Sequence, residues 1–213
     1  MQGPFIDKAC LAADLLLRAI FNNPKATGRP CPQSSKHSLH PPLTDKERQH
    51  SAALMRVNHA SEVCAQALYH GQSAATNSTW LKKEMQTAAL EEGDHLFWCQ
   101  TRLFELGSHP SYLNLLWYLG SYGIGYTAGK LGDAWSLGFL AETENQVIDH
   151  LAGHLKHLST YDPVSHDILQ QMQVDEAKHR DHAIQSGAKD LPGWAKWAMR
   201  GMSKIMVKTA YWI

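Results

Sequence analysis

Two short segments of the sequence carry the same pattern of metal-binding side chains. Each consists of an acidic residue, a glutamate, two spacers and a histidine, and the two are Glu91–His95 and Asp175–His179. On a helix, a glutamate and a histidine three residues apart point the same way, so the pair can bind one metal ion. A single pair of this kind is common on protein surfaces, and it is the repetition that indicates chemistry.

Each segment also follows a lone glutamate by the length of a helical hairpin. Glu62 precedes the first and Glu144 precedes the second, which predicts a duplicated helix pair. Folded as a four-helix bundle, the two pairs converge four carboxylates and two imidazoles on one interior point, as in ferritin-like di-iron or di-manganese centres. The predicted metal ligands are Glu62, Glu92, His95, Glu144, Glu176 and His179.

The charge of this set is itself an argument for metal. A carboxylate buried alone costs several kcal/mol or takes up a proton. Two divalent cations balance four glutamates, so the assembled site is neutral. Oxygen ligands with one imidazole per ion favour iron or manganese over a structural zinc site.

Two acidic residues are predicted to support the ligand histidines. Glu91 and Asp175 each stand just before a ligand glutamate, where each can accept a hydrogen bond from the ligand histidine of a neighbouring helix and fix its tautomer. The alternative is that both are solvated surface charges.

Other histidines are predicted to lie outside the ligand set. His59 precedes Glu62 in the reverse order, so we assign it to the surroundings of the metal or to a substrate pocket. His150 lies six residues past Glu144, off the ligand stripe, and is predicted to line a pocket or to form hydrogen bonds. His154 and His157 are expected to face solvent.

Four helices must position these residues. Thr44 and Glu47 fit a capping box, and Asp162-Pro163 fits an N-cap followed by a first-turn proline. The predicted helices run from Thr44 to about Ala75, from Trp80 to about Leu106, from about Asp133 to Leu158, and from Asp162 to near Gly187.

Two further segments are apolar or amphipathic. Ser111 to Gly129 is an aromatic, glycine-punctuated crossover between the helix pairs, which either rests on a membrane or covers the core or a subunit interface. Residues 189–213 form a helix with a basic stripe, Lys196, Arg200, Lys204 and Lys208, and an aromatic face suited to an anionic membrane.

The chain is therefore predicted to be all-α and to have three parts. Residues 1–43 hold an amphipathic helix over Ile6–Phe21 and a proline-rich linker, residues 44–188 form the ferritin-like bundle, and residues 189–213 form the membrane-associating helix. We expect no transmembrane helix and no secretory signal.

Composition narrows the class of protein. The chain has 213 residues, enough for one well-buried domain. Lys+Arg and Asp+Glu both number 20, so the overall charge does not favour a nucleic-acid partner. Four cysteines without a C-x-x-C pattern indicate free thiols in a reducing compartment and exclude a rubredoxin-type iron site.

Together, Arg56–Gln72, Glu91–His95, Glu144 with His150, and Asp175–His179 resemble the demethoxyubiquinone hydroxylases of ubiquinone biosynthesis in their proteobacterial form. The similarity extends from about Ala12 to the C-terminus. The resemblance implies that the six ligands hold two iron ions per chain, and that Glu92 and Glu176 bridge them.

The resemblance also implies hydroxylation, with O₂, of the ring of a polyprenylated methoxybenzoquinol. The chain has no dinucleotide, flavin or iron–sulfur motif, so electrons would come from outside, from NADH or from the quinol itself. The implied location is the cytoplasmic face of the bacterial inner membrane, as a peripheral protein. A homo-oligomer and partner proteins of ubiquinone biosynthesis stay open.

Two positions depart from the family pattern. Ser61 replaces the glycine usual before the first ligand, which narrows a helix contact, and Leu151 stands where some members have tyrosine.

Two other functions are also considered. One is a different ferritin-like oxidoreductase, such as a peroxidase or ferroxidase, and the other is a non-enzymatic helical module that binds quinones or membranes.

Overall fold

The computed structural model describes residues 10, 13–14, 17–18, 24–32 and 41–213. Over residues 41–213 the regular elements are six helices, which confirms the all-α fold class. They are α2 (Asp45–Ala75), α3 (Thr79–Glu105), α4 (Asn114–Lys130), α5 (Asp133–Leu158), α6 (Pro163–Gln185) and α7 (Gly193–Trp212). The N-terminal helix predicted over Ile6–Phe21 lies largely outside the described residues.

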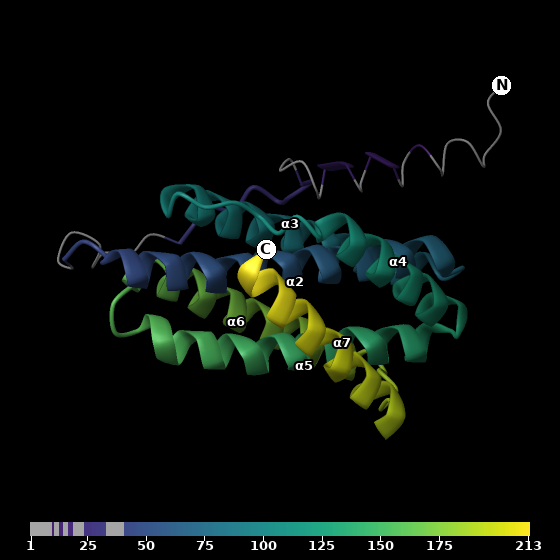
Figure 1. Ribbon diagram of the computed structural model, residues 1–213. Coiled ribbons are helices and arrows are strands. Elements are labelled where there is room, and N and C mark those ends of the chain that lie inside the picture. Colours follow the sequence, from purple (N-terminus) through teal and green to yellow (C-terminus); the bar gives the residue numbers. More distant parts are fainter. Residues whose placement is uncertain (1–9, 11–12, 15–16, 19–23, 33–40) are drawn as a thin grey trace.

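Four of the helices form the predicted ferritin-like bundle. α2 and α3 make one hairpin, α5 and α6 make the other, and the hairpins pack with α2 against α5 and α3 against α6. Figure 1 shows the two hairpins as two layers along a shared long axis. α2 is the central helix, because it also packs against α4 and α7 and buries most of its length.

Local sequence signals begin the helices where they were predicted to begin. The Thr44 side chain accepts from the backbone N–H of Glu47, and the Glu47 carboxylate accepts from the Thr44 N–H at 2.8 Å. Ser78 caps α3, and Asp162 caps α6 ahead of Pro163. These bonds satisfy N–H groups that have no partner within the helix.

The crossover between the hairpins is itself a helix, α4, and it lies very close to α2. A Cβ placed on Gly125 would lie 2.1 Å from the Leu68 carbonyl oxygen, and one on Gly71 would lie 2.3 Å from the Tyr122 carbonyl oxygen. Only glycine fits such an approach of two backbones. α4 thus covers the core with one face, while Leu115, Leu116 and Leu119 are exposed on the other.

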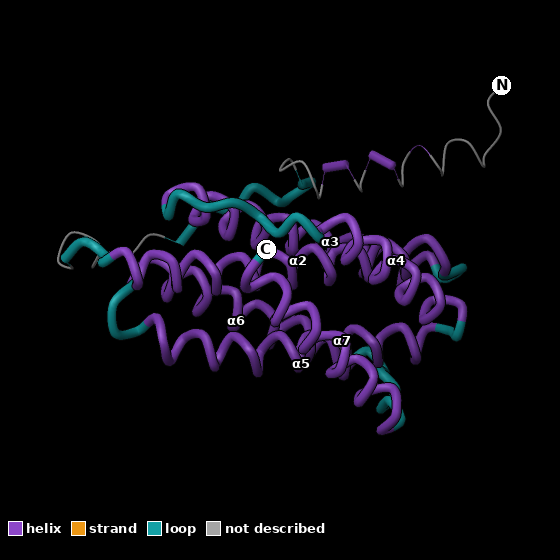
Figure 2. Tube along the Cα trace, viewed as in Figure 1, coloured by secondary structure: helices purple, strands orange, loops and turns teal. Residues whose placement is uncertain are grey.

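α7 crosses the bundle obliquely over α2 and α5 (Figure 2). It docks through Ala195, Met206 and Ala210, which are buried. Among the described residues, no helix is both long enough and apolar enough to span a bilayer. The division into 1–43, 44–188 and 189–213 stays a prediction.

The glycine contact gives a stability test. We expect Gly125→Ala to destabilise the protein by about 1–3 kcal/mol, because the new methyl group would push α4 away from α2. Gly123→Ala is the matched control, since a Cβ there meets nothing within 4 Å and alanine favours the same helix. Urea unfolding of both variants measures the difference, and equal stabilities would contradict the close contact.

Candidate metal centre

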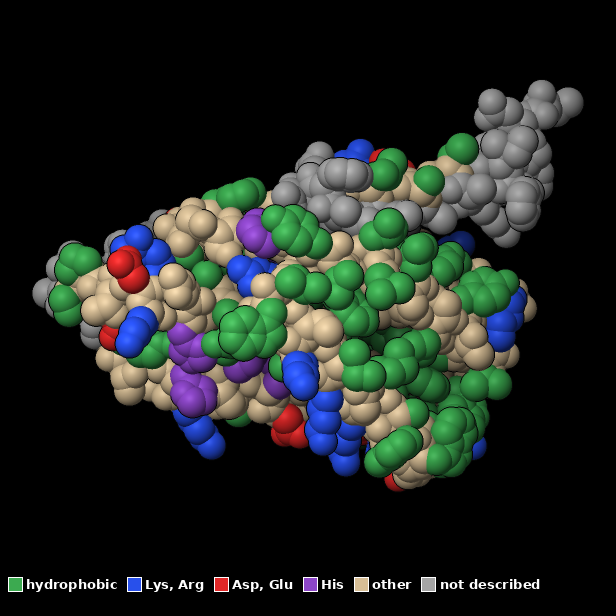
Figure 3. Space-filling model, in the orientation of Figure 1, with side chains coloured by type: hydrophobic (Ala, Val, Ile, Leu, Met, Phe, Trp, Pro, Cys, Tyr) green, Lys and Arg blue, Asp and Glu red, His purple; other side chains and the backbone are tan. Residues whose placement is uncertain are grey.

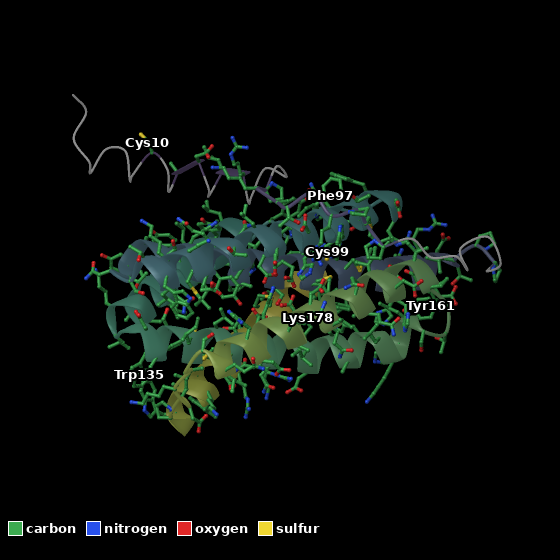
Figure 4. All side chains as sticks on the ribbon, turned by 180° about the vertical axis from the view of Figure 1, so that it is seen from behind. Cys10, Phe97, Cys99, Trp135, Tyr161 and Lys178 are labelled. Atoms are coloured by element: carbon green, nitrogen blue, oxygen red, sulfur yellow. The ribbon has the colours of Figure 1, made fainter. Side chains whose placement is uncertain are left out.

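All six predicted ligands meet in the middle of the bundle. Each comes from the inward seam of its helix: Glu62 from α2, Glu92 and His95 from α3, Glu144 from α5, Glu176 and His179 from α6. Viewed from behind, Figure 4 shows oxygen and nitrogen atoms gathered between the helices near the labelled Lys178 and Cys99. The two helical hairpins therefore bring the six side chains together, while their role as metal ligands stays a prediction.

The six side chains form two overlapping groups. Ligand atoms of Glu62, Glu92, His95 and Glu176 lie within 4.8 Å of one another, and so do those of Glu92, Glu144, Glu176 and His179. The groups share Glu92 and Glu176, the two residues expected to bridge. Two ions held by these groups would each have one imidazole and one unshared glutamate.

The two imidazoles are oriented alike. His95 Nδ1 lies 3.0 Å from Glu176 Oε1 and 3.1 Å from Glu92 Oε2, while His179 Nδ1 lies 3.3 Å from Glu176 Oε2 and 3.4 Å from Glu92 Oε1. Each ring therefore directs Nδ1 at the shared carboxylates and Nε2 outward. This is the orientation in which Nδ1 binds an ion and Nε2–H donates to a supporting group.

The buried carboxylate oxygens of the site suit divalent cations. The four glutamates are at most 1 % exposed. Both oxygens of Glu62, Oε1 of Glu92 and Oε2 of Glu144 have no hydrogen-bond partner among the described residues. Buried carboxylate oxygens without a donor are costly, and a cation is the partner that the donor set suits.

The pKa shifts of the six side chains also reflect the excess of buried carboxylates. Burial raises the pKa of Glu62 and of Glu144 well above the usual carboxyl range. Burial opposes charge on Glu92 too, but the adjacent imidazoles of His179 and His95 outweigh it and lower its pKa. The pKa of each histidine is raised, since the neighbouring carboxylates outweigh the effect of burial. One added proton on each of these two glutamates and two histidines supplies, in total, the same positive charge as two divalent cations.

The outward nitrogens meet the two acidic residues predicted to support them. His179 Nε2 is hydrogen-bonded to Glu91, and His95 Nε2 lies 3.4 Å from Asp175 Oδ2. Both contacts join α3 to α6, so each helix supports the histidine of the other. That they fix the tautomers stays a prediction.

The linker contributes a residue that the sequence did not reveal. Arg29 donates from Nη1 to Asp175 at 2.8 Å and from Nε to Asp94 at 3.2 Å, and its guanidinium lies over the Trp98 ring. The segment carrying it is held down by backbone bonds to Asp94, and a Cβ on Gly93 would lie 2.0 Å from the Lys25 carbonyl oxygen. Residues 24–32 therefore close the His95 side of the site.

Tyr69 is a second residue that the sequence reading did not assign to the site. Its hydroxyl donates to Glu144, and the side chain is fully buried. The signal was present in the sequence, because Tyr69 lies seven residues after Glu62 on the same inward stripe.

The remaining histidines surround the centre. His59 is buried and contacts Asn114, and burial lowers its pKa to about 4. His150 Nε2 lies 3.1 Å from Asn58 Oδ1, and burial lowers its pKa to about 4 as well. His154 was expected to face solvent, which is wrong: its Nδ1 lies 3.1 Å from the same Asn58 oxygen and it is half-buried. His157 is exposed as expected.

Two cavities flank the centre on opposite helix pairs. One, of about 370 Å³, is lined mainly by α3 and α6, which carry the histidines. The other, of about 380 Å³, lies between α2, α4, α5 and α7 and is mostly apolar. Ser61 and His150 line the apolar cavity, and Leu151 is part of the core. That Ser61 narrows a helix contact stays a prediction.

Comparison with known proteins identifies the relatives of this chain. Residues 49–210 match the family described as ubiquinone biosynthesis protein COQ7. Proteins named 3-demethoxyubiquinol 3-hydroxylase are 48 % identical in Nitrosococcus oceani, over 98 % of this chain and 96 % of that protein, and 50 % identical in Aromatoleum aromaticum, over 97 % and 98 %. The protein of that name from Bordetella parapertussis is 53 % identical over 80 % of this chain and 77 % of its own. This chain belongs to the ubiquinone biosynthesis protein COQ7 family.

Proposed function

We propose that this chain is a di-iron 3-demethoxyubiquinol 3-hydroxylase, which adds a hydroxyl group to the ring of a polyprenylated methoxybenzoquinol in ubiquinone biosynthesis. The observation that carries the proposal is the pair of ligand groups that share Glu92 and Glu176 inside a chain of this family. In the overall reaction one ring C–H bond becomes C–OH. O₂ supplies that oxygen and one water, and an external donor supplies two electrons with two protons.

Iron would be held by the residues already described. Glu62 and His95 would bind one ion, Glu144 and His179 the other, and the shared glutamates would bind both. When bound and reduced, the ions supply the activation of O₂. The chain supplies the rest: four helices fix the ligand positions, and the buried setting keeps water from the reacting groups.

The apolar cavity is the proposed site of the quinol ring. Its walls include Ser61, Thr143 and Val147, which are neighbours of Glu62 and Glu144 on the lone-glutamate helices. A few polar groups, among them Gln146 and His150, stand on otherwise apolar walls, as is common where a small molecule is oriented. His150 would be neutral at physiological pH, since burial lowers its pKa. A neutral imidazole can donate a hydrogen bond to a ring hydroxyl or accept one from it.

The isoprenoid tail points to the membrane as the source of the substrate. The cavity is bordered by α4 and α7, and these helices carry exposed aromatic and aliphatic side chains. They include Tyr112, Leu115, Leu116 and Leu119 near α4 and Trp194, Trp197, Ile205 and Trp212 on α7. Figure 3 shows hydrophobic side chains gathered over this region, with Lys and Arg beside them.

We infer that this face rests on the cytoplasmic surface of the bacterial inner membrane. The proposed electron donor is NADH or the quinol. α7 docks on the bundle with a different face, so its Trp-rich side stays free for lipid. The basic stripe is only partly free: Lys196 contacts Asp190 and Glu142, and Arg200 lies 3.7 Å from Glu142. Lys204 and Lys208 have no ion pair within the described part of the chain.

The activity can be tested on purified, iron-loaded protein given a short-chain prenylated demethoxyubiquinol, O₂ and NADH. We expect a hydroxylated product from the wild type and a loss of more than about a hundredfold for Glu144→Gln, because the change removes one carboxylate ligand. Asp149→Asn, an exposed change on the same helix, is the control. Product formed equally by Glu144→Gln would contradict the proposal.

The cavity assignment predicts a selective effect at Gly120. A Cβ placed there meets nothing within 4 Å, so Gly120→Leu can enter the cavity lining without a clash at Cβ. We expect kcat/KM for the prenylated quinol to fall about tenfold or more through KM, with stability unchanged. Gly123→Leu places the same side chain on α4 outside the cavity lining. Equal kinetics in the two variants would place the substrate elsewhere.

Membrane association can be measured by sedimentation with phosphatidylglycerol vesicles. Each lysine near an anionic surface contributes about 1 kcal/mol, so replacing Lys204 and Lys208 by glutamine should weaken binding at least about tenfold. Lys82→Gln with Lys83→Gln, two exposed changes on α3, should leave it unaltered. If both double variants bind like the wild type, the basic stripe is only solvated.

A further inference from the structure

The candidate ligands are not equally sealed from water. His95 and the four glutamates are at most 1 % exposed. The His179 side chain is 13 % exposed, and Glu91, its hydrogen-bond partner, is 37 % exposed. His179 is therefore the one of the six predicted ligands whose side chain is most exposed to solvent.

The cavity of about 370 Å³ opens at that place. Arg29, Asp175 and Lys178 line it together with two further acidic residues and two histidines, and apolar side chains complete its walls. The acidic residues are Glu84 and Glu91, and the histidines are His179 and His182. Glu84 and His182 are hydrogen-bonded at 2.7 Å, and their side chains are 30 % and 62 % exposed.

The cations in the lining are already paired. Arg29 binds Asp175 and Asp94, and Lys178 Nζ lies 3.0 Å from Asp175 Oδ1. In contrast, Glu84 and Glu91 contact only histidines among the ion pairs of the described residues. A carboxylate and imidazole pair of this kind can bind a divalent cation transiently.

The other approaches to the centre suit a hydrated cation poorly. On the His95 side, Arg29 and Trp98 cover the ring with the 24–32 segment held against α3. On the lone-glutamate side, the second cavity is lined mainly by methionine, leucine, tryptophan and other apolar side chains. Moving a divalent ion through such a lining carries a large desolvation cost.

We propose that the cavity beside His179 is the route by which divalent cations load the centre, with Glu84 and His182 as a transient ligand pair at its outer end. From there the ion passes to Glu91 and His179, about 10 Å along α3 from Glu84 at 1.5 Å per residue. No bond is formed or broken except to the ion, which exchanges water for carboxylate and imidazole ligands. The inference rests on the proposed di-iron function.

The test measures the rate of metal uptake rather than activity. Metal-free protein is mixed anaerobically with Co²⁺, whose visible absorption reports binding, and the series is repeated with Fe²⁺. For the double variant Glu84→Gln, His182→Gln, we expect uptake to slow about three- to tenfold, since two transient ligands and one charge are lost. Removal by a chelator should slow by the same factor, leaving affinity and the final metal content unchanged.

Two control variants test whether the loss of any charge or histidine on α6 slows metal uptake, or only a loss from the cavity lining. Asp181→Asn removes a charge next to His182, and His166→Gln removes a histidine farther along α6, and neither residue lines the cavity. Both should load at the wild-type rate. Because all four residues are at least partly exposed, the variants should fold, which thermal unfolding checks.

The failures can be told apart. Wild-type protein that takes up no Co²⁺ or Fe²⁺ overturns the proposed function and this inference with it. Normal loading by the double variant, or equal slowing by the controls, overturns only the loading route. Reduced affinity with a faster removal rate would also overturn it, because Glu84 and His182 would then belong to the final binding site.

Discussion

Neutrality of a buried charge cluster is the constraint on which this structure depends. Four glutamates and two histidines lie in the centre of the bundle with almost no exposure, and the medium there does not tolerate four uncompensated carboxylates. Protons on Glu62, Glu144 and the two histidines can supply the balance, as their raised pKa values indicate, and two divalent cations supply the same charge. The close packing of α4 on α2 and the Arg29 contacts hold the helices and the supporting carboxylates in place around this cluster.

The two sides of the bundle differ in the chemistry of their cavities. The helices that carry the histidines, α3 and α6, border a cavity with carboxylates and imidazoles, whereas the lone-glutamate helices, α2 and α5, border an apolar cavity closed by α4 and α7. Cations and a lipid-soluble quinol have opposite solvation needs, so the two approaches proposed above would let one buried site serve both. The exposed apolar side chains of α4 and α7 lie on the helices that border the apolar cavity, the proposed site of the quinol ring.

The helices and the positions of the six predicted ligands could be predicted from the sequence, because helix starts and the faces of helices depend on residues close together in the chain. The capping box at Thr44 and the proline after Asp162 set helix starts, and the spacing of Glu62, Glu92, Glu144 and Glu176 set which seams face one another. The resemblance to the family came from the segments around the predicted ligands, Arg56–Gln72, Glu91–His95, Glu144 with His150, and Asp175–His179, and membership of the family is confirmed. What the sequence could not supply were contacts between distant segments. Arg29 lies 65 residues from Asp94 in a linker without periodicity, and His154 was misplaced because its partner, Asn58, lies on another helix.

The most direct measurement of the central claim is anomalous scattering at the iron edge, from crystals of protein loaded anaerobically with Fe²⁺. Two peaks per chain are expected about 3–4 Å apart, as in other two-metal sites. One should lie next to His95 and one next to His179, with Glu92 and Glu176 reaching both. No peak inside the bundle, or iron bound only at the surface, would contradict it.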